Sequence, residues 1–234
     1  MRHDLRWFRG PREERTRAPG AIAIMLDSSR NVMLACALTV LAGYVDAIGY
    51  LHLGGLFVSF MSGNSTRLGV SLAAGDWRNA AAACGLIVLF VTGAAAGSLV
   101  VHSRSRHRQP WLLLIEAMLL TLSALCYTLG WPVIAVAAIV LAMGLENAVF
   151  QIEGGGLGLT YITGALVKAG QLIAAALTGG ARLAWLPNVL LWAALVVGAV
   201  LGALGYRWIN LAAIWFAAGF ALALSGIVAV MVHR

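Results

Sequence analysis

Long apolar stretches follow one another along almost the whole chain and constrain its fold more than any other feature. Each stretch has roughly the 20 residues that an α-helix needs to cross the hydrocarbon core of a bilayer. Apolar residues make up 61% of the 234 and charged residues only 11%, so a soluble domain would lack the polar side chains to cover its surface. We therefore predict an all-α polytopic transmembrane bundle. The eight stretches are 32–51, 55–74, 79–101, 111–130, 132–150, 156–177, 184–206 and 208–232.

The charged residues and cysteines exclude several other classes. The net charge of +7 comes from short basic clusters outside the apolar stretches, without a nucleic-acid-binding motif, so no nucleic acid is expected as a partner. The three cysteines stand alone and the five histidines are scattered, so neither a metal nor a cofactor is expected. No catalytic triad, HExxH or phosphate-binding loop occurs, and we do not expect an enzyme. An intramembrane enzyme is the weakest alternative.

Residues 1–30 form a separate, polar segment. Seven of the 16 basic residues lie here, together with acidic residues and prolines. Because basic segments stay on the cytoplasmic side of a membrane, we predict a cytoplasmic N-terminal tail before the first membrane helix.

Two halves of the chain resemble each other when the sequence is shifted by 101 residues. The matches fall on polar and glycine positions, whereas chance matching would align mainly Leu, Ala and Val. We predict two internal repeats, residues 31–130 and 131–234, in one integrated membrane domain. The matched positions are Gly43–Ala47 with Gly144–Ala148, Gly54–Leu56 with Gly155–Leu157, Ser59–Gly63 with Thr160–Gly164, Arg67 with Lys168, Gly69 with Gly170, and Gly97 with Gly198.

Glycines at a spacing of four occur in the third stretch of each half. Small residues at this spacing let two helix backbones approach closely, within one chain or across a homodimer. We predict a helix-packing role for Gly93, Gly97, Gly198 and Gly202.

The stretches 55–74 and 156–177 are too polar for ordinary lipid-facing helices. An Arg or Lys at a helix centre costs at least about 2.5–3.5 kcal/mol on insertion scales. If both stretches are broken or re-entrant, six segments cross, and the inside holds twelve basic residues against two outside. If all eight cross, the counts are ten and four. The positive-inside bias favours six crossings, with the second half inverted relative to the first, and eight crossings remain the alternative.

The polar residues of the two stretches, with the acids and the amide of the helices that precede them, are the candidates for a substrate or ion site between the repeats. Asp46 and Glu146 are suited to carry protons or a cation, and Arg67 and Lys168 to hold an anionic group. The alternative is that Asp46–Arg67 and Glu146–Lys168 are ion pairs that fix the fold. A further acid, Glu116, is expected to pair with Arg108 at the membrane interface. The complete candidate set is Asp46, Ser62, Gly63, Asn64, Thr66, Arg67, Glu146, Asn147, Thr160, Thr163, Gly164, Lys168 and Gln171.

Two motifs resemble the YoaK family of bacterial multi-pass membrane proteins, a family of unknown function. The first spans residues 42–69 and matches through Asp46, Gly54, Gly55, Ser59, Met61, Gly63, Asn64, Thr66 and Arg67. In the second, Gly144–Ala148 and Thr160–Gly164, the chain has Glu146 where the family has Gln and Ala165–Lys168 where it has Thr-Leu-Thr-Arg. The resemblance implies a protein of the bacterial cytoplasmic membrane.

The functional prediction is a small secondary transporter or permease. Inverted repeats with broken polar segments at matching places are typical of such proteins. The expected partners are the lipid bilayer and a small polar or ionic substrate. The alternative is a non-transporting membrane scaffold or sensor that works through its N-terminal tail.

Overall fold

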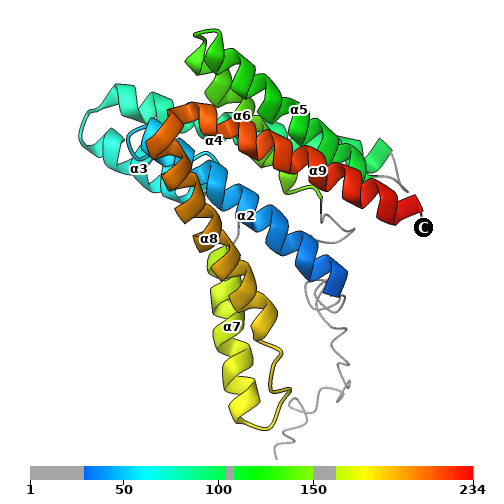
Figure 1. Ribbon diagram of the computed structural model, residues 1–234. Coiled ribbons are helices and arrows are strands. Elements are labelled where there is room, and N and C mark those ends of the chain that lie inside the picture. The colour runs from blue at the N-terminus through cyan, green and yellow to red at the C-terminus, as the bar shows by residue number, and fades with distance from the viewer. Residues whose placement is uncertain (1–28, 104–107, 150–161, 234) are drawn as a thin grey trace, which may run out of the picture.

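The computed structural model describes residues 29–103, 108–149 and 162–233. Over these residues the chain is helical apart from its connections (Figure 1). The predicted tail, residues 1–30, lies outside the described residues except for its last two. The elements are α2 (Ser29–His52), α3 (Met61–Ala73), α4 (Trp77–Ser103), α5 (Arg108–Thr128), α6 (Pro132–Glu146), α7 (Ile162–Leu177), α8 (Leu186–Ile209), the 3-10 turn η1 (Asn210–Ala213) and α9 (Ile214–His233).

Helix lengths separate membrane-spanning helices from shorter ones. Stretches long and apolar enough to cross a membrane lie in α2, in α4, in α5 and in the run Leu186–Met231, which holds α8, η1 and α9. By contrast, α3 has 13 residues, α6 has 15 and α7 has 16. At 1.5 Å per residue they measure about 20, 22 and 24 Å, less than the roughly 30 Å of a hydrocarbon core. The all-helical membrane class is therefore confirmed.

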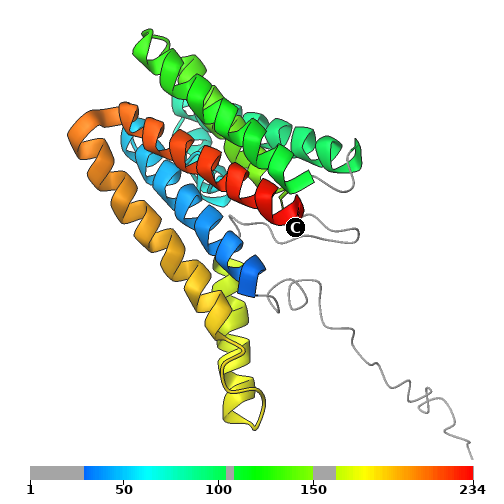
Figure 2. The same cartoon turned by 45° about the vertical axis from the view of Figure 1, so that its right-hand side comes forward.

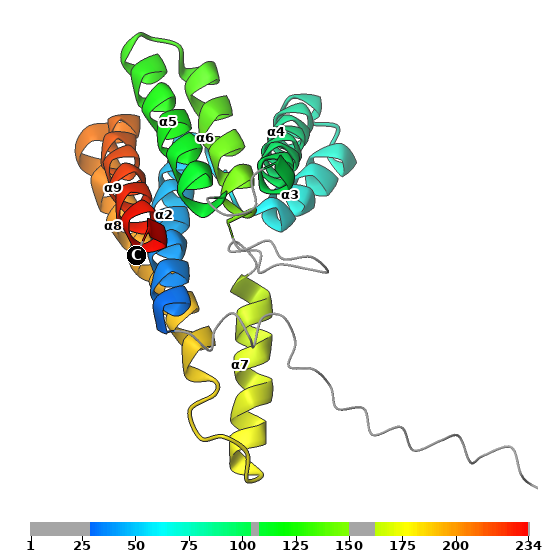
Figure 3. The ribbon, with the colours of Figure 1, turned by 90° about the vertical axis from the view of Figure 1, so that its right-hand side faces the viewer.

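The ends of the helices gather on two sides of the bundle. The start of α2, the start of α5 and the end of α9 lie at the right of Figure 1, and the α3–α4, α5–α6 and α8–α9 connections lie at the left. The view in Figure 2 keeps this separation. Figure 3 shows α7 and its connection to α8 extending away from the other helices, whereas α8 runs beside α2.

The α5–α6 connection shows how local sequence ends one helix and begins the next. Gly130 adopts a φ of 82°, a left-handed conformation that favours glycine. The Trp131 N–H donates to the Cys126 carbonyl at 2.8 Å, which closes the end of α5. Pro132 then occupies the first turn of α6, where a missing N–H costs nothing. The result is a short antiparallel hairpin, and its two helices pack together.

Two pairs of helices meet through glycine backbone. Helix α2 packs along α8, and α4 packs along α6. A side chain at any of six glycines would collide with the facing helix, so these contacts require Gly. The facing backbone groups are Leu195 for Gly43, Val40 for Gly198, Tyr44 for Gly202, Leu141 for Gly93, Leu145 for Gly97 and Phe90 for Gly144.

We predict that Gly93→Ala destabilises the protein and that Gly85→Ala does not. A Cβ at Gly93 would overlap the Leu141 carbonyl, and relieving such overpacking costs about 1–3 kcal/mol. Gly85 lies on the same helix with open space around it, and alanine is the better helix former. Thermal unfolding in detergent, followed by size-exclusion chromatography, measures both variants. Equal melting temperatures for the two would contradict the close α4–α6 contact.

Candidate functional site

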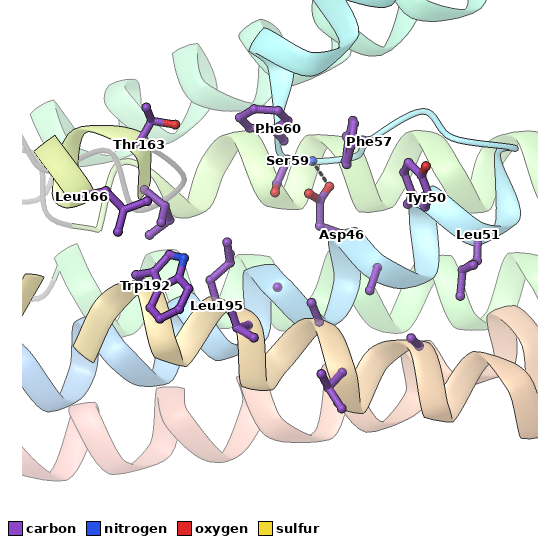
Figure 4. A pocket seen from close by; sticks show the side chains of 17 residues that line it. Asp46, Tyr50, Leu51, Phe57, Ser59, Phe60, Thr163, Leu166, Trp192 and Leu195 are labelled. Atoms are coloured by element: carbon purple, nitrogen blue, oxygen red, sulfur yellow. Dashed lines mark hydrogen bonds between the residues drawn. The ribbon is translucent and has the colours of Figure 1, made fainter. Parts of the chain in front are cut away.

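The loop of residues 53–60, between α2 and α3, is the non-helical part of the first polar stretch. It leaves the end of α2 and runs back beside that helix until α3 begins near Asp46, as Figure 4 shows. Gly54 and Gly55 have φ values of 63° and 98°, which a residue with a side chain rarely adopts, and they make this reversal possible.

Asp46 on α2 binds the end of this loop. Its Oδ1 accepts hydrogen bonds from the N–H groups of Val58 and Ser59, each at 2.8 Å. These N–H groups belong to the residues that lead into α3, so Asp46 satisfies donors that have no partner within a helix.

Asn64 on α3 holds the middle of the loop. Its Oδ1 accepts from the Phe57 N–H at 2.9 Å, and its Nδ2 donates to the Phe57 carbonyl at 2.7 Å. The side chain is fully buried. One amide therefore supplies both a donor and an acceptor to a single loop residue, as a neighbouring β-strand would.

Arg67, one turn further along α3, holds the beginning of the loop. Its Nη1 donates to the Gly55 carbonyl at 2.8 Å, and its Nη2 donates to the Gly54 carbonyl at 3.5 Å. A Cβ at Gly55 would overlap this guanidinium, so the glycine also makes room for the arginine. Asn64 and Arg67 are three residues apart and therefore share one face of α3, and both side chains reach the loop from that face.

The alternative of two ion pairs is not what the described residues form. Asp46 accepts from backbone N–H groups and Arg67 donates to backbone carbonyls, so each charge serves the loop and not the other charge. Glu146 is fully buried, and within the described residues its oxygens have no hydrogen-bond partner, whereas Lys168 is exposed on α7. The reason is physical: a non-helical loop presents more unpaired backbone groups than one ion pair would satisfy.

A cavity of about 720 Å³ lies next to Asp46. Its wall comes from α2, the 53–60 loop, α7 and α8, as the side chains in Figure 4 show. Asp46 is the one acidic or basic side chain among the described residues that line the cavity. The aromatic residues of the wall are Tyr50, Phe57, Phe60 and Trp192.

The other predicted site residues lie in several places. Thr163 lines the cavity, whereas Asn147 ends α6 and donates its amide to the Met143 carbonyl at 2.9 Å. Thr160 lies outside the described residues. Gly63 and Gly164 are partly buried, with Gly63 packed against the Phe57 and Phe60 rings. Six candidates are exposed, which differs from the expected interior site: Ser62, Thr66, Lys168 and Gln171, together with Arg67 and Thr163.

The aromatic wall of the cavity and the burial of Glu116 were not predicted from the sequence. Tyr50, Phe57 and Phe60 flank the glycine pair of the first motif. Their position beside these glycines is the sequence feature from which the aromatic wall could have been predicted. Glu116 is fully buried on α5, and within the described residues its oxygens have no hydrogen-bond partner, whereas an ion pair with Arg108 was expected. A charge within an apolar stretch generally faces the bundle interior, and this rule identifies Glu116 from the sequence.

Apolar helices of this length, with large hydrophobic side chains exposed around the bundle, define a multi-pass membrane protein. A family model described as "Protein of unknown function (DUF1275)" matches residues 34–227, and the chain belongs to this family. The resemblance to YoaK is thereby confirmed, because YoaK is a member.

A curated relative supports the same assignment. The chain is 38% identical over 189 residues to the "UPF0700 transmembrane protein RA0705" of Rhizobium meliloti (strain 1021), covering 80% of this chain and 81% of the relative. No solved structure matches the chain.

We predict that Asn64→Ala destabilises the protein strongly, whereas Ser65→Ala does not. Removal of the Asn64 amide leaves the Phe57 N–H and carbonyl without partners, at about 1–3 kcal/mol for each group. Ser65 is exposed and donates to the Met61 carbonyl of its own helix, so its loss costs little. Thermal unfolding of the purified variants measures the difference. An Asn64→Ala protein as stable as Ser65→Ala would show that the amide does not hold the loop.

Proposed function

We propose that this protein is a small secondary transporter, not an enzyme, and that the cavity beside Asp46 is its substrate site. The observation that carries the proposal is the origin of the cavity wall. One side comes from residues 43–60 of the first half, and the other from residues 162–203 of the second half. A site between two halves is where movement of one half against the other would expose a substrate to either side of a membrane.

The glycine contacts support two structurally equivalent halves. Val40 and Leu141 are 101 residues apart, as are Tyr44 and Leu145. The glycines that face these residues are also evenly spaced between the halves. Gly198 lies 105 residues after Gly93, and Gly202 lies 105 residues after Gly97. Each first helix thus meets the third helix of the other half with the same register.

This register changes one of the matches predicted from the sequence. At a constant shift of 101, Gly97 is matched with Gly198. The contacts instead make Gly97 equivalent to Gly202, because Gly97 faces Leu145 and Gly202 faces the matching residue Tyr44. The starts of α3 and α7 still differ by 101 residues, so four additional residues enter the second half between α7 and α8. A surface connection accommodates such an insertion without disturbing packed helices.

The placement of the helix ends supports six crossings with an inverted second half. The start of α2, the start of α5 and the end of α9 share one side, and the α3–α4 and α8–α9 connections lie opposite (Figure 1). We assign the first side to the cytoplasm of a bacterial inner membrane, because it carries the basic tail and the cluster at residues 104–108. In this arrangement α3 and α7 are half-helices that do not cross.

The wall of the cavity favours an organic cation as substrate. Asp46 contributes a carboxylate, and no basic side chain of the described residues lines the cavity to neutralise it. Aromatic rings at the wall attract a cation through their π faces and also bury an apolar body. The volume of about 720 Å³ suits a drug-sized molecule.

The first test uses ethidium, an aromatic organic cation, as the probe. Proteoliposomes that contain the full chain and enclosed DNA report ethidium entry by fluorescence. We expect protein-dependent entry that Asp46→Asn slows by about tenfold or more, since a desolvated contact to a charge is worth about 1.5–3 kcal/mol. Asn at this position retains an oxygen acceptor for Val58 and Ser59, so the loop is preserved.

Two controls make this test specific to the cavity. Asp76→Asn removes an exposed carboxylate in the α3–α4 connection and should leave entry unchanged, because asparagine also caps a helix. The anion carboxyfluorescein should not enter faster than through protein-free membranes. Ethidium entry that is equal with and without protein, or equal in the Asp46→Asn and Asp76→Asn variants, would overturn the proposal.

A further inference from the structure

Two acids lie inside the bundle away from the cavity wall. Glu116 on α5 and Glu146 at the end of α6 are both fully buried. All four of their carboxyl oxygens lack a hydrogen-bond partner within the described residues. The helices pack against each other, and the two carboxyl groups are close enough to interact electrostatically. Neither residue lines the cavity beside Asp46.

The surroundings of the pair provide no neutralising charge within the described residues. Glu116 is the one charged group that acts on Glu146. The buried neighbours along the two helices are apolar, among them Leu113, Ala117 and Met143. Among the side chains that the structure describes, the helices packed against α5 and α6 carry the following titratable groups, none of which hydrogen-bonds to either acid: Cys36, Tyr44, Asp46, Tyr50 and His52 on α2, Arg78, Cys84 and His102 on α4, and Cys126 and Tyr127 on α5 itself. Two further titratable residues lie at helix ends, Arg108 on α5 and His233 on α9, and their side chains are outside the described part.

Two adjacent carboxylates cannot both stay charged in such a place. An isolated charge costs tens of kcal/mol in a medium of low dielectric constant, and a second like charge adds repulsion. The pair therefore needs a counter-charge or a proton. A metal ion would need additional oxygen or nitrogen ligands, and no group of three His, Cys, Asp or Glu side chains occurs in the part of the chain that the structure describes.

We propose that Glu116 and Glu146 form a proton-binding site in the α5–α6 hairpin, where at least one proton is shared between the two carboxyl groups at neutral pH. The site goes beyond the proposed transport function, because its protonation requires no substrate. In a membrane protein, such a buried acid pair provides a place where proton uptake changes the charge inside the bundle.

Infrared spectroscopy of the full chain in lipid tests this site directly, since a protonated carboxyl has a carbonyl band that a carboxylate lacks. We expect the band at neutral pH, its loss as the pH is raised, and its complete loss in the double variant Glu116→Gln/Glu146→Gln. Gln has the size of a protonated Glu, so the double variant should fold. Asp76→Asn, which removes an exposed acid, should leave the band unchanged.

Isotope labelling keeps the test decisive if the double variant does not fold. Glutamate labelled with ¹³C must shift the band of the unmodified protein, since the proposal assigns the band to Glu. A band that is absent at neutral pH, that does not shift with labelled glutamate, or that disappears in Asp46→Asn would overturn the proposal. Loss of the band on adding NaCl would also overturn it, because the pair would then bind a cation in place of the proton. None of these outcomes depends on ethidium entry, so the two proposals fail separately.

Discussion

The structure depends on how the backbone of residues 53–60 is hydrogen-bonded. Lipid provides no water for unpaired N–H and carbonyl groups, so non-helical backbone at membrane depth must be satisfied by the protein itself. Three polar side chains do this: Asp46 binds the end of the loop, Asn64 the middle and Arg67 the beginning. The motif that stands out in the sequence as a candidate site is thus also the set of contacts that makes the loop possible.

This hydrogen bonding has a consequence for function. Because the loop runs back beside α2, the Phe57 and Phe60 rings and the Asp46 carboxylate all reach the same cavity. Oδ1 of Asp46 is occupied by the loop, yet the residue still lines the cavity wall. In the proposed transport function this carboxylate has an electrostatic role in addition to its structural one. The Asp46→Asn substitution tests the electrostatic role because it keeps an oxygen acceptor for the loop.

Much of this architecture could be predicted from the sequence, because membrane helices are defined by apolar length. The predicted stretches 79–101 and 184–206 became α4 and α8 within a few residues. The stretch 55–74 was singled out through Arg67, since a charge is costly in a lipid-facing helix. Its helical part, α3, begins only at residue 61.

The rest depended on contacts that a sequence does not state. Asp46 and Arg67 looked like partners because opposite charges attract, but backbone groups are more numerous and bind both. The match of Gly97 with Gly202 required the helix contacts, because four additional residues before α8 shift the alignment. Similarly, the pairing of Glu116 with Glu146 follows from how α5 and α6 pack, and no short-range pattern encodes it.

The central claim is that the chain enters and leaves the membrane on the same side between residues 53 and 73. Single cysteines at Ala74 and Ser105, in a chain lacking its three native cysteines, test it with an impermeant thiol reagent on intact cells. The account predicts that Ala74→Cys is labelled from outside, and that Ser105→Cys is labelled only after lysis. The opposite pattern would mean that α3 crosses the membrane, and it would contradict the half-helix, the inverted halves and the transport mechanism built on them.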